Sequence, residues 1–193
     1  LRDVENTPVE FDADTHFTEF GSAHNIVINE ESGYAYVVGT NRNGPYNGGP
    51  LFINIQNPTA PIFEGGFANG GYSHDAQVVT YNGPDTDYSG KEILIGSNED
   101  EVVIVDVSDK MNPVIISTIG YSNIQYTHQG WFTEDLRYFI VGDELDEQNI
   151  GTNTRTLIFD FNDLDSPTLS FEYIAQNTSI DHNGYTVGDR YFL

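Results

Sequence analysis

Four histidines recur at nearly constant intervals and stand in similar surroundings. His24, His74, His128 and His182 lie in the phrases SAHNIVI, YSHDAQVV, YTHQGWF and IDHNGYTV, each beside small polar residues. The intervals between them are 50, 54 and 54 residues. Imidazoles that converge on one point can hold a transition-metal ion. An interval near fifty residues also predicts a structural repeat, which must be defined before any motif is interpreted.

The same histidines have a structural interpretation. Each is followed by a side chain that can form hydrogen bonds, and in a strand this side chain points to the opposite face. These neighbours are Asn25, Asp75, Gln129 and Asn183. A residue type that recurs in every repeat is typical of structural positions, so we expect each imidazole to fasten its repeat to the next. Ser73 and Thr127 are the expected partners, and metal binding or catalysis is the alternative.

The segment DTDYSG at residues 85–90 resembles the start of a calcium-binding loop. Asp85, Asp87 and Ser89 alternate oxygen-bearing side chains, and the glycine that follows permits a sharp turn. The last position of the motif lacks the usual Glu, so Glu92 is the candidate for the remaining ligand. Ca²⁺ is therefore the cofactor that the sequence favours, ahead of a transition metal. The alternative is a hairpin loop whose aspartates bind their own backbone.

Two acidic clusters offer a different chemistry. The segments SNEDE at residues 97–101 and GDELDE at residues 142–147 concentrate carboxylates at the ends of apolar runs. Paired carboxylates can act as acid and base in glycoside cleavage, but acidic turns are commoner on an acidic protein. The sequence has no serine nucleophile elbow, phosphate-binding glycine loop or metalloprotease motif. It therefore favours a protein without catalytic activity over an enzyme.

Short apolar runs must position these residues. The second repeat contains DAQVVTY, KEILIGSN, EVVIVDVS and VIISTIGY, and the breaker DKMNP separates the third run from the fourth. The other two repeats follow the same order, with NPTAP and DLDSP as breakers. Runs of four to eight residues rich in Val, Ile, Phe and Tyr predict strands. Proline cannot donate to a strand ladder, so it belongs at a connection.

Four strands in each repeat of about fifty residues, without helices, are typical of a β-propeller blade. We expect an all-β fold with four-stranded antiparallel blades at 21–70, 71–124 and 125–178. Residues 1–20 should end a preceding blade, and residues 179–193 should start a following one. Three blades cannot close a ring, so we expect a segment of a longer protein. A β-sandwich is the alternative, but it does not predict a regular four-strand period.

Composition limits the partners. The 193 residues have 7 basic and 30 acidic side chains, which gives a net charge of −23. Such a charge repels nucleic acid and anionic lipid but suits hard cations. The chain has no cysteine, which excludes disulfides and thiolate metal sites. No apolar run is long enough to span a membrane.

The motifs also resemble a known family. VVIVDVSD at 102–109 is similar to the LVIVD repeat of bacterial surface propellers. Together with SHDAQVVTYNGPDTDYSGKEI, YTHQGWFTEDLRYFIVGDELDEQNIGTNTR and DHNGY, it resembles the choice-of-anchor B family over essentially the whole chain. The resemblance implies a secreted or outer-surface bacterial propeller with a variable anchoring tail and without an established enzymatic activity. Relatives often carry cysteines near the His-Asp-Ala-Gln phrase and in the loop that reads GPYNGGP here, so any disulfide that those relatives have is absent from this chain.

Two functional interpretations follow. The first is a non-catalytic, calcium-stabilised interaction module that binds a protein, glycan or matrix ligand through a loop face of the propeller. The second is a metal-dependent enzyme, similar to an oxygenase or hydrolase, with the histidine cluster at the mouth of the channel. We expect neither nucleic acid as a partner nor membrane insertion by this segment.

Overall fold

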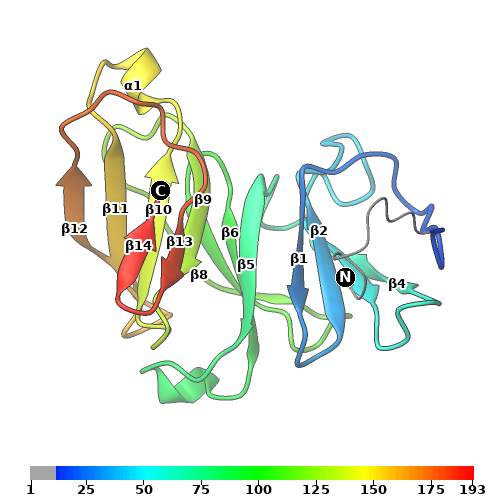
Figure 1. Cartoon of the computed structure of the whole chain (residues 1–193). Helices are drawn as coiled ribbons and strands as arrows, with labels where there is room; N and C mark the ends of the chain where they lie inside the picture. Colours follow the sequence, from blue (N-terminus) through cyan, green and yellow to red (C-terminus); the bar gives the residue numbers. More distant parts are fainter. Residues whose placement is uncertain (1–11) are drawn as a thin grey trace, which may run out of the picture.

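The computed structural model describes residues 12–193, and strands form most of its regular structure (Figure 1). Of the predicted preceding blade, residues 1–11 lie outside the described range and residues 12–20 contain no strand. The only helical segments in the described range are short, namely a 3₁₀ turn at Thr86–Tyr88 and α1 at Asp146–Asn149. The prediction of an all-β chain is confirmed.

Consecutive strands form three four-stranded antiparallel sheets and one hairpin. The first sheet contains β1 (Asn25–Asn29), β2 (Tyr34–Val38), β3 (Leu51–Asn54) and β4 (Ile62–Gly66). The second contains β5 (Asp75–Thr80), β6 (Glu92–Ser97), β7 (Val102–Asp106) and β8 (Val114–Ile119). The third contains β9 (Thr127–Phe132), β10 (Tyr138–Asp143), β11 (Arg155–Asp160) and β12 (Thr168–Ile174), and β13 (Tyr185–Val187) pairs with β14 (Arg190–Phe192). The predicted four-strand period is therefore confirmed.

The first strands of successive sheets lie next to one another. β1 contacts β5, β5 contacts β9, and β9 contacts β13. Within each sheet the strand order follows the chain, so the fourth strand lies farthest from these contacts. Any residue at the start of a first strand is consequently brought close to its counterparts in the neighbouring sheets.

The second sheet is buried on both faces. Along β6, Ile93 and Ile95 pack against the third sheet, whereas Leu94 packs against the first. The neighbouring strand β7 alternates in the same way, with Ile104 on one face and Val103 on the other. Side chains alternate between the faces of a strand, so a strand between two sheets must be apolar at successive positions. This explains the continuous apolar run VVIV in the second repeat.

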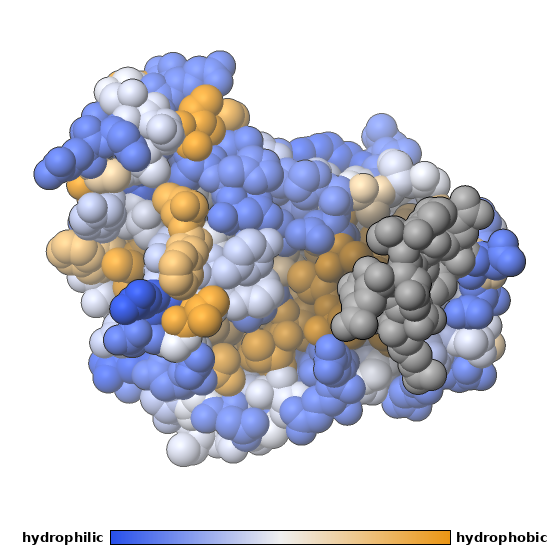
Figure 2. Space-filling view, viewed as in Figure 1, coloured by the Kyte–Doolittle hydropathy of each residue, from blue (hydrophilic) through white to orange (hydrophobic). Residues whose placement is uncertain are grey.

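Apolar side chains are exposed on the two outer faces of this assembly. Ile26 and Ile28 of β1 are about half exposed, and Figure 2 shows a hydrophobic stretch over this strand. All of β12 is exposed, including Phe171 and Tyr173. The same kinds of side chain are buried where two sheets meet.

A buried ion pair within the second repeat is joined by hydrogen bonds to residues of the first. Lys110 Nζ lies 2.7 Å from Glu92 Oε2, and both side chains are almost completely buried. The other oxygen of Glu92 accepts hydrogen bonds from Asn29 Nδ2 at 2.8 Å and Ser32 Oγ at 2.5 Å. Burial raises the pKa of Glu92, but the hydrogen bonds from Lys110 and Ser32 outweigh burial and hold this pKa below its ordinary value.

We expect Lys110→Gln to lower the free energy of unfolding by about 3 kcal/mol, because it leaves the Glu92 carboxylate buried without its cation. Lys91→Gln is the matched control. Lys91 is half-exposed and lies 3.5 Å from Asp106, so the loss there should stay within about 0.5 kcal/mol. Both losses are measured by denaturant titration at neutral pH.

The pH dependence provides a second measurement. The pKa of Glu92 is lower in the folded protein than in the unfolded chain, where a glutamate has a pKa of about 4.3. Ionised Glu92 therefore stabilises the fold above this pH, and the stabilisation is lost as the pH falls through the folded pKa. The stability difference between wild type and Lys110→Gln should therefore shrink below this pH. A difference that stays constant in acid would contradict the ion pair.

Candidate metal centre

The first strands bring the four histidines together. His24 and His74 stand immediately before β1 and β5, His128 is the second residue of β9, and His182 precedes β13 by a few residues. Ring centroids are 4.1 Å apart for His24 and His74, and 4.5 Å apart for each of the next two pairs. The histidines therefore form a row of neighbouring rings, as the equivalence of their positions predicted.

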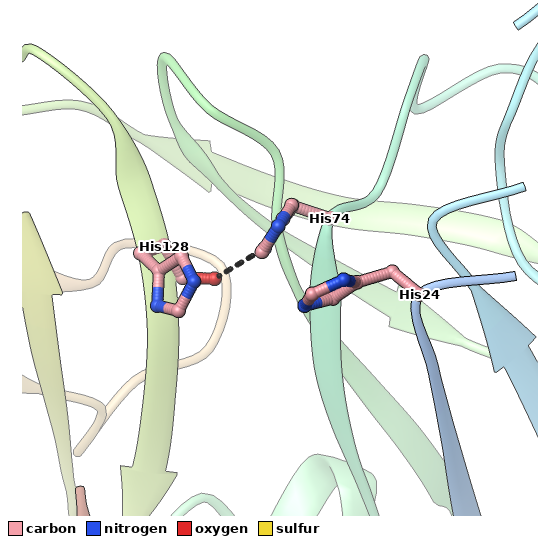
Figure 3. Close-up of side chains that lie close together, drawn as sticks. All are labelled: His24, His74 and His128. Atoms are coloured by element: carbon pink, nitrogen blue, oxygen red, sulfur yellow. Dashed lines mark hydrogen bonds between the residues drawn. The ribbon is translucent and has the colours of Figure 1, made fainter. Parts of the chain in front are cut away.

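This row is curved. The His24 and His128 rings are only 6.4 Å apart although His74 lies between them, so the three rings cannot lie on a straight line. Figure 3 shows the side chains of His24, His74 and His128 around the same space between β1, β5 and β9. The curvature brings ring nitrogens from three different sheets toward one another.

Main-chain carbonyls fix the orientation of the two inner rings. His74 Nδ1 lies 3.3 Å from the carbonyl oxygen of His128, and His128 Nδ1 lies 2.9 Å from the carbonyl oxygen of His182. A carbonyl oxygen only accepts, so each Nδ1 must carry the proton and donate. The Nε2 atom of each neutral ring then keeps its lone pair, which is the form in which histidine binds a metal ion.

The partners of these rings differ in part from the prediction. Both His74 and His128 bond to the next repeat, as a fastening role requires. The expected local partner Thr127 is not used, because its hydroxyl bonds to the Tyr121 hydroxyl at 3.0 Å. A main-chain carbonyl of the next repeat thus takes the place of the expected local hydroxyl.

Burial keeps the inner rings neutral. His74 and His128 are 8% and 1% exposed, whereas His24 and His182 are exposed. Burial, followed by the charge of neighbouring histidines, lowers the pKa of His74. Burial also lowers the pKa of His128, against the opposing effects of the His182 carbonyl and the Glu144 carboxylate. Both lowered pKa values favour the neutral imidazole, the form that metal coordination requires.

Two overlapping sets of side chains in this row could each hold a metal ion. In His24, His74 and His128, one ligand atom from each residue lies within 4.8 Å of the others, and the same is true of His128, Glu144 and His182. Nitrogens bound to one tetrahedral ion at about 2.0–2.1 Å lie about 3.3 Å apart, so modest rotation would close either set. Imidazole donors suit Zn²⁺, Cu²⁺, Ni²⁺ or iron.

The predicted calcium loop is arranged differently from the expectation. Asp85 caps the 3₁₀ turn by accepting from Asp87 N at 3.2 Å, and its other oxygen accepts from Leu164 N at 2.8 Å. Ser89 follows the turn as its C-terminal cap. Glu92 does not join them, because it lies in the buried network with Lys110. The Glu92 carboxylate is therefore engaged by other partners and does not belong to the group of oxygens that gathers around Asp85.

Two residues of another repeat take its place. Asp163 and Asp165, in the breaker DLDSP, each offer an oxygen within 4.8 Å of Asp85 and of each other. They line an open hollow together with Asp87. The sequence shows that the breaker DLDSP is acidic. That this breaker faces the loop at residues 85–90 follows only from the packing of the second sheet against the third. Calcium binding at this loop stays a prediction.

Three carboxylates of the two acidic clusters pair with basic side chains. In SNEDE, Glu99 pairs with Arg42 at 2.6 Å. In GDELDE, Asp143 and Asp146 pair with Arg155 at 3.1 Å and 2.5 Å. These carboxylates neutralise buried or neighbouring cations, which is a structural role and not that of a free acid–base pair.

Comparison with known proteins does not identify the chain: no protein-family model matches its sequence, and no curated protein does either. The resemblance to the choice-of-anchor B family and the expected surface location therefore stay predictions. Within residues 12–193, no helix has the length and apolar character needed to cross a membrane.

We expect Ca²⁺ at millimolar concentration to raise the melting temperature, because an ion that binds only the folded state stabilises it. Asp165→Asn should reduce this rise, since Asp165 belongs to the group around Asp85. Asp189→Asn is the control and should retain the rise, because Asp189 is fully exposed and lies outside this hollow. Thermal melts with and without Ca²⁺ measure the effect, and an equal rise in wild type and Asp165→Asn would remove this loop from consideration.

Proposed function

We propose that the chain is a segment of a β-propeller and that its histidine row binds a transition-metal ion. The propeller interpretation is supported by three successive four-stranded sheets whose first strands adjoin and whose facing sides are apolar. The exposed apolar side chains of β1 and β12 suit packing against further blades, because the inner blade boundaries bury the same residue types. In a propeller, the histidines would line one end of the central channel.

The observation that carries the metal proposal is the pair of hydrogen bonds from Nδ1 to a carbonyl oxygen. Metal-binding histidines commonly donate their other ring N–H to a carbonyl or carboxylate, which fixes the tautomer and orients the ring. His74 and His128 both do so. The fastening role and the metal role therefore use different nitrogens of the same ring.

The surroundings favour an accessible ion. His24 is exposed, so an ion held by His24, His74 and His128 would keep a position open toward solvent, as catalytic sites do. The Glu144 carboxylate lies 3.6 Å from His128 Nε2. A carboxylate in this position can become a ligand of the ion or accept a proton from its bound water. This supports a metal-dependent hydrolase or oxygenase as the class of enzyme to test.

A hollow beside the row favours the second proposal, an interaction module at a loop face. It has a volume of about 420 Å³ and is lined by Arg42, Tyr72 and Glu99 among other polar residues. Arg42 lies 3.5 Å from the centre of the Tyr72 ring, and this ring is 6.5 Å from that of His74. An aromatic side chain among hydrogen-bonding groups suits a glycan or a peptide. On this proposal the protein is secreted or at the bacterial cell surface.

We expect the purified chain to bind about one Zn²⁺ or Co²⁺, with Co²⁺ giving the visible absorption of a nitrogen-ligated ion. His74→Ala should lower the affinity by at least about 100-fold, because it removes a ligand and not merely a supporting group. His16→Ala is the matched control, since His16 is exposed and lies outside the row. Metal content by elemental analysis and Co²⁺ titration provide the measurements.

If His74→Ala is unstable, His74→Gln keeps the polar character of the position, and circular dichroism checks its fold. An ion that binds equally well to wild type and to both His74 variants would contradict the metal proposal. Ca²⁺ alone, or no ion, would leave the interaction module as the better proposal.

A further inference from the structure

A second group of acidic side chains meets between α1 and residues 175–184, the segment that joins β12 to β13. Asp146 and Glu147 begin α1, and Asp181 lies in the joining segment. Their exposed fractions are 0%, 9% and 3%. Burial, followed by the charges of Glu147 and Asp146, raises the pKa of Asp181 to about 8. All three side chains are therefore buried, and the Asp181 carboxyl group lies near enough to the other two for their charge to act on it.

Most oxygens of this group have no hydrogen-bond donor. One oxygen of Asp146 and both oxygens of Glu147 and Asp181 are buried without a partner. Within residues 12–193, every buried carboxylate oxygen in this condition belongs to these three side chains. A buried acceptor without a donor costs about 1–3 kcal/mol, and more when it is charged. Such oxygens are stabilised either by a bound proton, as the raised pKa of Asp181 indicates, or by a positive partner.

The basic residues of the described chain do not supply it. Arg155 reaches only the other oxygen of Asp146, at 2.5 Å, and is shared with Asp143. The remaining basic residues of this range pair at other sites: Arg42 with Glu99, Lys91 with Asp106, Lys110 with Glu92, Arg137 with Asp160 and Arg190 with Asp189. Among residues 12–193, none lies within salt-bridge distance of Glu147 or Asp181.

The fold also holds Asp181 in place. Thr154 N donates to Asn177 O at 3.2 Å, and Thr154 Oγ1 donates to Asn177 Oδ1 at 2.7 Å. Ala175 N donates to Thr154 O at 2.9 Å. Gly142 of β10 leaves room for the carboxylate, since a side chain at this position would collide with Asp181. The joining segment is thus fixed with its carboxylate turned inward.

We propose that Asp146, Glu147 and Asp181 bind one Ca²⁺ ion, which fastens residues 175–184 to α1. Ca²⁺ accepts six to eight oxygen ligands at about 2.3–2.6 Å in flexible geometry. Mg²⁺ requires a near-ideal octahedron and retains several waters, so a buried site made of carboxylates suits it less. The ligand atoms of these three side chains do not all lie within 4.8 Å of one another, as those of the histidine groups do, so binding one ion would require α1 and the joining segment to move closer together. Nitrogen-rich sites select other ions, so this proposal does not require the histidine row to bind a metal.

Calcium titration of the full chain in an Asp163→Asn background tests the proposal, because this change disables the exposed group around Asp85. We expect about one Ca²⁺ per chain and a higher melting temperature with the ion. Adding Asp181→Asn should lower the calcium affinity by at least about tenfold and remove the rise. Without Ca²⁺, Asp181→Asn should instead raise the melting temperature, since it removes an unpartnered buried carboxyl group.

Two further variants complete the test. Glu147→Gln should reproduce the loss of affinity, and it replaces Asp181→Asn if that variant does not fold. Asp189→Asn is the matched control, because Asp189 is fully exposed beside β13, and it should leave the calcium response unchanged. The proposal is overturned if the Asp163→Asn background shows no calcium response, or if the response survives both Asp181→Asn and Glu147→Gln.

Discussion

The hydrogen bond from a histidine ring to the main-chain carbonyl of the next histidine is the contact on which the inner edge of the molecule depends. It joins His74 to His128 and His128 to His182, at 3.3 Å and 2.9 Å. Each bond crosses a boundary between sheets, fixes the orientation of one ring and occupies only one of its nitrogens. This hydrogen bond recurs at the same position of successive repeats. The Nε2 atoms therefore lie in a curved row as a consequence of the repeat itself.

Other polar side chains also join the sheets at these boundaries, so the histidines are not the sole contacts that hold them together. Asn25 donates to the Asp75 carboxylate at 2.9 and 3.0 Å, and Gln129 accepts from the backbone N–H of Gly184 at 2.9 Å. Both are side chains that directly follow a histidine, and they occupy the other face of the strand. One face of each first strand therefore joins the sheets, while the other presents imidazoles, so fastening and metal binding are compatible.

The sheets and the histidine row were predictable because both follow from patterns within one repeat. The alternation along β6 requires only neighbouring residues, and equivalent histidines in equivalent strands must be neighbours. The ligand sets were not predictable, because they combine residues of different repeats. Glu92 could turn toward the calcium loop or toward Lys110, and only the adjacent sheet decides. Asp163 and Asp181 acquire their neighbours only when their connecting segments are placed over another sheet.

The two proposed centres meet in one short segment, because Asp181 and His182 are adjacent. An ion at Asp181 would hold the segment that presents the His182 carbonyl to His128, so the segment would be ordered before the nitrogen site is filled. A ligand that binds to a segment already ordered loses less conformational entropy. Calcium would then raise the affinity of the histidine row for its metal, and by linkage the metal would raise the affinity for calcium. In a chain with net charge −23, bound cations would relieve the repulsion between carboxylates, and this segment would let two of them act together.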